Sequence, residues 1–139
     1  MATRAMYLCG ACGKVAATVT LVPPGQPDPR PRPKPPAVPP GTGKVVSEVF
    51  PSYARLAIDG GPVSLTRGPV SMEQVTIALR TGSAAALFEI EQEYAPFWCP
   101  KCRASYCREH YRSWPVFDDC FFDCLRGVCP KGHERILED

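Results

Sequence analysis

The sequence predicts an α+β fold, a small and β-rich domain, and three observations favour it. Pairs of cysteine and histidine residues recur at short spacing near both ends of the chain. Short runs of β-branched and aromatic residues are cut by proline and glycine, a pattern typical of short strands. One later segment repeats its apolar residues at helical spacing. With 139 residues, the chain is expected to form one folded unit with a modest core.

The N-terminal segment, residues 1–22, combines a ligand pair with a strand. The pair is Cys9-x2-Cys12, and Gly13 follows it where a tight turn favours a residue without a side chain. Residues 15–22 are apolar and rich in β-branched types. We therefore expect a strand directly after this first knuckle.

Residues 23–43 are expected to form a proline-rich loop or linker. From residue 23 to residue 40, ten of the eighteen residues are proline, which excludes a regular helix or a central strand. Such a stretch favours polyproline II or irregular structure. Residues 33–36 also fit the P-x-x-P pattern of peptides that bind aromatic grooves, so a docking peptide is the alternative.

Residues 44–98 are expected to form a small α+β block with several short elements. Strand candidates, bounded by proline and glycine, cover residues 45–50, 53–58 and 63–66. Residues 86–94 alternate apolar residues with glutamates, which favours a further strand with one face in water. That strand would lead into the ligand pairs of the C-terminal segment.

One helix is expected within this block, after the strand candidates. Ser71 and Gln74 have the S-x-x-Q form of a capping box, and Gly82 stands where a C-terminal cap would. Between them, Val75 and Leu79 repeat on one face together with Met72. The sequence therefore predicts a helix that begins after Ser71 and ends at Gly82.

The C-terminal segment, residues 99–139, carries three more ligand pairs. They are Cys99-x2-Cys102, Cys107-x2-His110 and Cys129-x3-His133. Zn(II) in a structural role takes four thiolate or imidazole ligands in a tetrahedron. Four pairs therefore predict two closed sites and two zinc ions. Disulfides fit less well, because histidines at ligand spacing follow the cysteines and no secretory leader pattern is seen; we expect a reducing, cytoplasmic location.

The spacing leaves two ways to combine the four pairs. In a zinc ribbon, consecutive pairs share an ion. That grouping would place Cys9, Cys12, Cys99 and Cys102 at one site and Cys107, His110, Cys129 and His133 at the other. In a cross-brace, alternate pairs share an ion. The four-residue gap between Cys102 and Cys107 suits the second arrangement, because it lets the two middle pairs face opposite ways.

The run from Trp98 to His110 resembles the centre of the FYVE, PHD and AN1 group of cross-brace or treble-clef fingers. Tyr106, just before the fifth ligand, is similar to the aromatic residue that these fingers use as a core plug. The resemblance covers residues 99–139 and the N-terminal pair. It implies one zinc on Cys9, Cys12, Cys107 and His110, and a second zinc on Cys99, Cys102, Cys129 and His133. The long separation between the first two pairs departs from these families, so residues 44–98 would be an insertion or a platform.

Only some of the residues by which these families perform their functions have counterparts in this sequence. The basic stretch by which FYVE domains bind a phosphoinositide is absent before Cys99, and Gly127 occupies the place where many PHD domains carry a Trp. The segment Cys129-Pro130-Lys131-Gly132-His133 resembles the close of a RING domain. Arg135 follows it, like the arginine by which RING domains dock a ubiquitin-loaded carrier. This resemblance implies an adaptor in a ubiquitin-like conjugation pathway.

Cys120 and Cys124 are left outside the four pairs, and three roles compete for them. They are one helical turn apart, which favours buried structural thiols on a short helix or turn. They could instead replace the N-terminal pair as ligands beside Cys107 and His110. A nucleophilic role is disfavoured, because the neighbouring aspartates would raise the pKa of a thiol.

The function expected from these patterns is a non-catalytic, zinc-stabilised protein-interaction module. Four ligands close each site, whereas catalytic zinc keeps an open position. Residues 99–139 interleave arginines with aromatic residues, so nucleic-acid binding is the alternative, but acidic residues make the segment nearly neutral and favour a protein partner. No apolar run approaches the ~20 residues of a membrane span, so no membrane partner is expected. The oligomeric state is left open.

Overall fold

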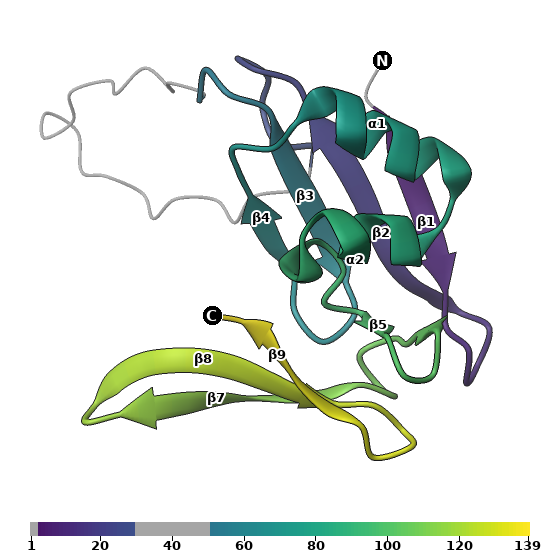
Figure 1. The fold of residues 1–139 in the computed structure, drawn as a ribbon, viewed down its shortest axis with the longest axis vertical. Helices are drawn as coiled ribbons and strands as arrows, with labels where there is room; N and C mark the ends of the chain where they lie inside the picture. The colour runs from purple at the N-terminus through teal and green to yellow at the C-terminus, as the bar shows by residue number, and fades with distance from the viewer. Residues whose placement is uncertain (1–2, 30–50) are drawn as a thin grey trace, which may run out of the picture.

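The structure is a computed structural model, and it describes residues 3–29 and 51–139. Within these residues it contains three small sheets and two short α-helices, arranged as Figure 1 shows. The elements are β1 (Arg4–Leu8), β2 (Val15–Val22), β3 (Arg55–Gly60), β4 (Leu65–Arg67), α1 (Met72–Thr81), α2 (Ala84–Ile90), the 3-10 helix η1 (Gln92–Tyr94), β5 (Trp98–Cys99), β6 (Ala104–Ser105), β7 (Arg112–Asp118), β8 (Phe121–Val128) and β9 (Glu134–Glu138). The strand expected at residues 45–50 and the P-x-x-P segment lie outside the described residues. No helix in the described ranges is long and apolar enough to cross a membrane.

The largest sheet has the order β1-β2-β3-β4, with antiparallel neighbours, and both helices cover one of its faces (Figure 1). The strand expected at residues 15–22 is confirmed as β2. Successive side chains of a strand point to opposite faces, so Val19 and Leu21 of β2 enter the same core beneath the helices. Ile58 of β3 and Leu87 of α2 complete the centre of this core, and both are fully buried.

Helix α1 forms where its caps predicted it. The Ser71 hydroxyl accepts a hydrogen bond from the Gln74 backbone N–H at 3.4 Å. Gly82 has φ of 69°, and its N–H donates to the carbonyl of Leu79 at 3.2 Å. Glycine adopts this left-handed conformation without the steric penalty of a Cβ. The helix buries Val75, Ala78 and Leu79 against the sheet.

The strand expected at residues 86–94 is wrong, because the structure has helix α2 followed by η1. Three consecutive alanines, Ala84 to Ala86, favour a helix through their high intrinsic propensity. Leu87 and Ile90 are three residues apart and therefore share a helical face. Leu87 packs into the core beneath the helix. The alternation of apolar residues and glutamates was a misleading signal.

The third sheet, of order β7-β8-β9, extends away from the rest of the molecule as a long ribbon (Figure 1). The expectation of two buried thiols on a short helix or turn holds only in part, because Cys120 lies in the turn of this ribbon but is exposed, whereas Cys124 is buried in β8. The turn residues Asp119 and Cys120 have φ of 45° and 72°. Positive φ at both central residues matches the type I′ turn of a two-residue hairpin.

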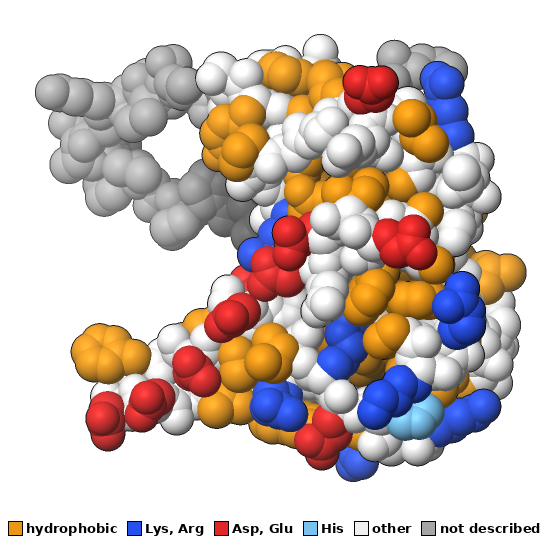
Figure 2. Space-filling model, viewed as in Figure 1, with side chains coloured by type: hydrophobic (Ala, Val, Ile, Leu, Met, Phe, Trp, Pro, Cys, Tyr) orange, Lys and Arg blue, Asp and Glu red, His pale blue; other side chains and the backbone are white. Residues whose placement is uncertain are grey.

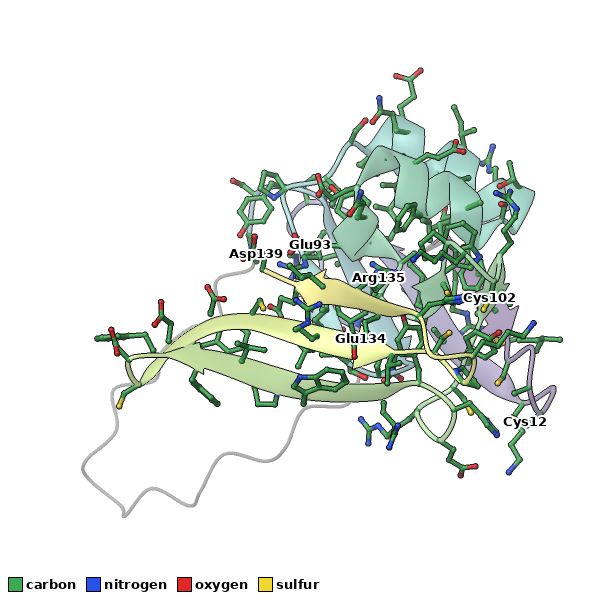
Figure 3. The ribbon with its side chains drawn as sticks, turned by 60° about the horizontal axis from the view of Figure 1, so that its bottom comes forward. Cys12, Glu93, Cys102, Glu134, Arg135 and Asp139 are labelled. Carbon is green, nitrogen blue, oxygen red and sulfur yellow. The ribbon has the colours of Figure 1, made fainter. Side chains whose placement is uncertain are left out.

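Two arginines join this ribbon to the helical layer. Arg135 of β9 donates through Nη1 to the carbonyls of Ala95 and Trp98 and through Nη2 to that of Gln92, and its guanidinium lies 5.1 Å from the centre of the Phe88 ring. Arg67 of β4 pairs with Glu93 at 3.3 Å and with Glu138 at 3.6 Å. Figure 3 shows Arg135 between the ribbon and the helices, with Glu93 close to the C-terminal Asp139. The ribbon is thus attached through β9, and also through β7, where the Ser113 hydroxyl donates to the Pro62 carbonyl at 3.1 Å.

Candidate metal centres

Each of the four ligand pairs lies in or beside a turn, and Cys99 is the last residue of β5. The pairs occupy the β1–β2 turn (Cys9, Cys12), the β5–β6 turn (Cys99, Cys102), the β6–β7 connection (Cys107, His110) and the β8–β9 turn (Cys129, His133). Strand β6 brings the turns together, since the Gly10 N–H donates to the Ser105 carbonyl at 2.8 Å. Cys9 and Ser105 also form a parallel bridge. Figure 3 shows Cys12 and Cys102 on the same side of the molecule.

The turns bring the ligand atoms into two groups. The first group is Cys9, Cys12, Cys107 and His110, and the second is Cys99, Cys102, Cys129 and His133. Within each group all four ligand atoms lie within 4.8 Å of one another. Alternate pairs are therefore grouped, as in a cross-brace, and consecutive pairs are not. Among the described residues, Cys120 and Cys124 join neither group.

The distances within the groups suit a tetrahedral zinc ion. Zinc at about 2.3 Å from sulfur and about 2.0 Å from nitrogen places two sulfur atoms about 3.8 Å apart, and sulfur and nitrogen about 3.5 Å apart. In the first group, the Sγ atoms of Cys12 and Cys107 are 3.7 Å apart, and His110 Nδ1 lies 3.7 Å from Cys9 Sγ and 3.2 Å from Cys107 Sγ. All cysteines are free, and 3.7 Å is far beyond the roughly 2.05 Å of a disulfide.

The second group repeats this geometry. The Sγ atoms of Cys102 and Cys129 are 3.7 Å apart. His133 Nδ1 lies 3.6 Å from Cys99 Sγ, 3.2 Å from Cys102 Sγ and 3.4 Å from Cys129 Sγ. In both groups Nδ1 is the imidazole atom that faces the sulfurs. The residues present therefore fit two Cys3His metal sites.

Backbone N–H groups in the turns point at the sulfurs. Such bonds, each 3.4 Å long, run from Ala11 to Cys9, from Cys102 to Cys99 and from His133 to Cys129. Burial raises the pKa of Cys9, but backbone N–H donors, led by that of Cys107, outweigh it and lower the pKa to about 6. Burial likewise raises the pKa of Cys129, and the N–H of His133 is foremost among the donors that lower it. Hydrogen bonds to the charged form favour thiolates, the form that binds metal.

The two remaining buried cysteines of the ligand groups show the opposite balance. Burial raises the pKa of Cys99 and of Cys107, and the backbone donors near them do not fully offset it. Removing a charged thiolate from water is unfavourable unless a cation or donor compensates it. A metal ion supplies that compensation, so these two thiols would ionise most readily as ligands.

A second small core surrounds the two groups. Tyr106, the residue similar to the aromatic plug, is buried there, and its ring meets the ring of Tyr111 edge-on with centroids 6.2 Å apart. Leu137 of β9 is fully buried in the same cluster. A Cβ on Gly127 would lie 2.5 Å from Leu137 and 2.9 Å from Tyr111, so any other residue at this point of β8 would force these side chains to move. The four turns that carry the ligand pairs, which we call the ligand turns, therefore pack against this second core.

Three residues of this region were not singled out from the sequence for the roles that they have. Arg103 follows Cys102 in the same way that Gly13 follows Cys12, and it has φ of 54°. Its guanidinium lies 5.9 Å from the centre of the Trp98 ring. Gly13 itself has φ of 76°. The equivalence of the two positions is a signal in the sequence, because each follows the second cysteine of a C-x2-C pair. Nothing in the sequence marks the roles of Tyr111 and Arg135, which depend on tertiary contacts.

Comparison with known proteins gives one match. Residues 1–139 match the family model described as a domain of unknown function (DUF8328). No curated protein matches the chain, and no solved structure matches it. Because the family match covers the whole length of the sequence, the chain belongs to the DUF8328 family.

Proposed function

We propose that this chain is a non-catalytic protein-interaction domain whose fold is held together by two structural zinc ions. The observation that carries the proposal is the closure of each site by four protein donors at tetrahedral spacing. Structural zinc is bound by four protein ligands, whereas catalytic zinc keeps one position for water or substrate. Cys9, Cys12, Cys107 and His110 would hold one ion, and Cys99, Cys102, Cys129 and His133 the other.

The zinc ions would supply folding energy. A structural zinc site contributes on the order of 10 kcal/mol in finger peptides at neutral pH, comparable with the roughly 5–15 kcal/mol stability of a whole domain. The first site would join the β1–β2 hairpin to the connection between β6 and β7. The second would join the β5–β6 turn to the β8–β9 turn. Metal binding would therefore fix the N-terminal strands to the C-terminal ribbon.

The carboxylates beside the ligands support a structural role. A hydrolytic zinc site pairs an open metal position with a nearby Glu or Asp that acts as base. Glu109 is exposed beside His110, and Glu134 pairs with Arg126 at 3.7 Å. Each of these acids adjoins a ligand, but neither is placed beside an open coordination position, because four donors surround each site.

Charge favours a protein partner over nucleic acid. The formal net charge is +2 with neutral thiols. Three thiolates and one Zn(II) carry a charge of minus one at each site, so loading both sites lowers the net charge to zero. Figure 2 shows Lys and Arg side chains gathered at the lower right, around the ligand turns, and this keeps nucleic acid as the second candidate. Strong binding to nucleic acid normally requires a larger positive surface.

The RING-like adaptor role receives no support from the surroundings of Arg135. That role needs a guanidinium free to reach a ubiquitin carrier. Here the guanidinium is largely buried and donates to backbone carbonyls of Gln92, Ala95 and Trp98. We therefore leave a role in ubiquitin-like conjugation out of the proposed function.

Removal of the metal tests the proposal. Purified protein is stripped with a high-affinity zinc chelator, and folding is followed by the dispersion of its NMR amide signals. We expect dispersion to be lost on stripping and restored by Zn(II). Retention of the native spectrum after complete removal, verified by elemental analysis, would contradict a structural role.

The salt dependence of binding separates the two partner classes. Short duplex DNA and single-stranded RNA of mixed sequence are titrated into zinc-loaded protein at rising salt. We expect weak binding to both, already at low salt. Tight binding that falls steeply as salt increases would assign the ligand turns to nucleic acid instead.

A further inference from the structure

The outer part of the β7–β8 ribbon, residues 116–124, is not needed to place any metal ligand. We call this segment the ribbon tip. Strand β9 pairs with β8 only from Leu125 to Val128, so among the residues that the structure describes the tip has no third strand beside it. The ligands that flank β7 and β8 lie at the opposite end of the ribbon. A two-stranded ribbon alone is marginally stable in water, and the projection therefore calls for another explanation.

The tip exposes three phenylalanines. Their side chains are 61% (Phe117), 77% (Phe121) and 51% (Phe122) exposed. Phe117 and Phe122 are cross-strand partners, and their rings meet edge-on with centroids 6.3 Å apart. Single exposed apolar residues are common, but a cluster of large aromatic side chains on a projection is typical of an interaction surface.

The charged residues of the tip itself all have one sign. Asp118, Asp119 and Asp123 lie within the tip, and no Lys or Arg occurs between residues 116 and 124. Figure 2 shows the acidic side chains and an exposed hydrophobic group along the arm at the lower left, far from the basic ligand turns at the lower right. A cationic partner would be attracted to the tip and repelled from the opposite end. This polarity disfavours nucleic acid and anionic membranes as occupants of the tip.

We propose that the ribbon tip is a docking surface for an extended, arginine-rich segment of a protein partner. This rests on the proposed function as a protein-interaction domain. A guanidinium stacks on aromatic rings and pairs bidentately with carboxylates, and a lysine ammonium does neither as well. The chain shows the stacking within itself, where Arg135 lies over Phe88 at 5.1 Å and Arg103 lies 5.9 Å from the centre of the Trp98 ring.

An NMR titration tests the docking surface directly. The probe is a synthetic nine-residue peptide of alternating glycine and arginine, compared with its lysine twin, added to zinc-loaded full chain. We expect shift changes confined to residues 116–124. The arginine peptide should bind about two- to five-fold more tightly than the lysine peptide, as stacking at an exposed site predicts.

Two double variants separate the aromatic and the acidic contributions. Phe117→Ser with Phe122→Ser, and Asp118→Asn with Asp123→Asn, should each weaken binding of the arginine peptide about tenfold or more. The matched controls lie on α1. Ile77→Ser removes an apolar side chain that is 60% exposed, and Glu73→Gln removes an exposed carboxylate. Both controls should bind like the parent chain.

Several outcomes would overturn the docking proposal. They are the absence of shift changes at the tip, shift changes centred on the ligand turns, or equal effects of the tip variants and the controls. Tip-dependent binding to neutral phosphatidylcholine vesicles without any response to the arginine peptide would assign the phenylalanines to a lipid surface and also overturn it. Zinc content is measured on the same samples. Two zinc ions with no peptide binding would refute the docking surface and leave the structural role of zinc standing.

Discussion

Replacing Arg135 with methionine tests how the ribbon is held to the helical layer. Arg135→Met keeps a flexible apolar stem over Phe88 and removes the guanidinium that donates to three carbonyls. Hydrogen bonds to a charged group contribute about 1.5–3 kcal/mol each, so a simple count would predict a loss of several kcal/mol. The structure predicts a smaller loss of unfolding free energy, because the three carbonyls differ in the hydrogen bonds that they keep in the variant.

Two of the carbonyls keep other partners. The Ala95 carbonyl also accepts from the Trp98 N–H at 3.2 Å, and the Gln92 carbonyl accepts from the Ala95 N–H at 3.4 Å. In an antiparallel ladder, pairs that share hydrogen bonds alternate with pairs that share none. The Tyr106 N–H donates to the Phe97 carbonyl, so the next pair, Trp98 and Ser105, shares none, and the Trp98 carbonyl has no partner in the β5–β6 ladder. One buried carbonyl would therefore lose its partner, at a cost of about 1–3 kcal/mol.

The net loss of unfolding free energy is expected to be about 2 kcal/mol, since the variant also avoids the burial of a cation. Burial lowers the pKa of Arg135, which marks that desolvation. Urea unfolding of zinc-loaded protein, followed by tryptophan fluorescence, measures the loss. The exposed Arg80→Met on α1 is the control and should change stability by less than about 0.5 kcal/mol. A loss for Arg135→Met no larger than that of the control, with both zinc ions retained, would show that Arg135 does not hold the ribbon to the helical layer.

Three further predictions follow from the same structure. Gly127→Ala should lower the unfolding free energy by about 1–3 kcal/mol in urea unfolding, because the new Cβ would meet Leu137 and Tyr111; a neutral result would show that β9 can shift. Cys120→Gly should raise it by about 0.5–1 kcal/mol, measured by thermal unfolding, since φ of 72° suits glycine. Cys12→Ser should remove one zinc ion and much of the roughly 10 kcal/mol of its site, whereas Cys120→Ser should leave zinc content unchanged; equal zinc loss in both variants would contradict the grouping.

The fold could be predicted where local chemistry decides it. Strand β2 and helix α1 follow from β-branched residues and from the caps at Ser71 and Gly82. Helix α2 could not be predicted from alternation, because glutamates at every second position mimicked a strand while the alanines favoured a helix. Its packing on the sheet through Leu87 decides the outcome, and a single sequence does not reveal that contact.

The candidate metal sites, like the fold, could be predicted from the sequence only in part. Short spacing within each pair fixes which residues can act together, because a knuckle holds both donors in one turn. Spacing does not fix which pairs meet, since ribbon and cross-brace groupings use the same eight residues. That choice is made by β6, which places Cys102 on one side and Cys107 on the other, and by the bridge from Cys9 to Ser105. These contacts join residues far apart in the sequence.

The most direct test of the account is the number of zinc ions bound, measured by native mass spectrometry on the parent chain and on two double variants. We expect two ions in the parent chain, one in Cys9→Ser/Cys12→Ser, and two in Cys120→Ser/Cys124→Ser. Loss of an ion from the second variant with none lost from the first would contradict it. In that case Cys120 and Cys124 would be ligands, and the N-terminal hairpin would be free of metal.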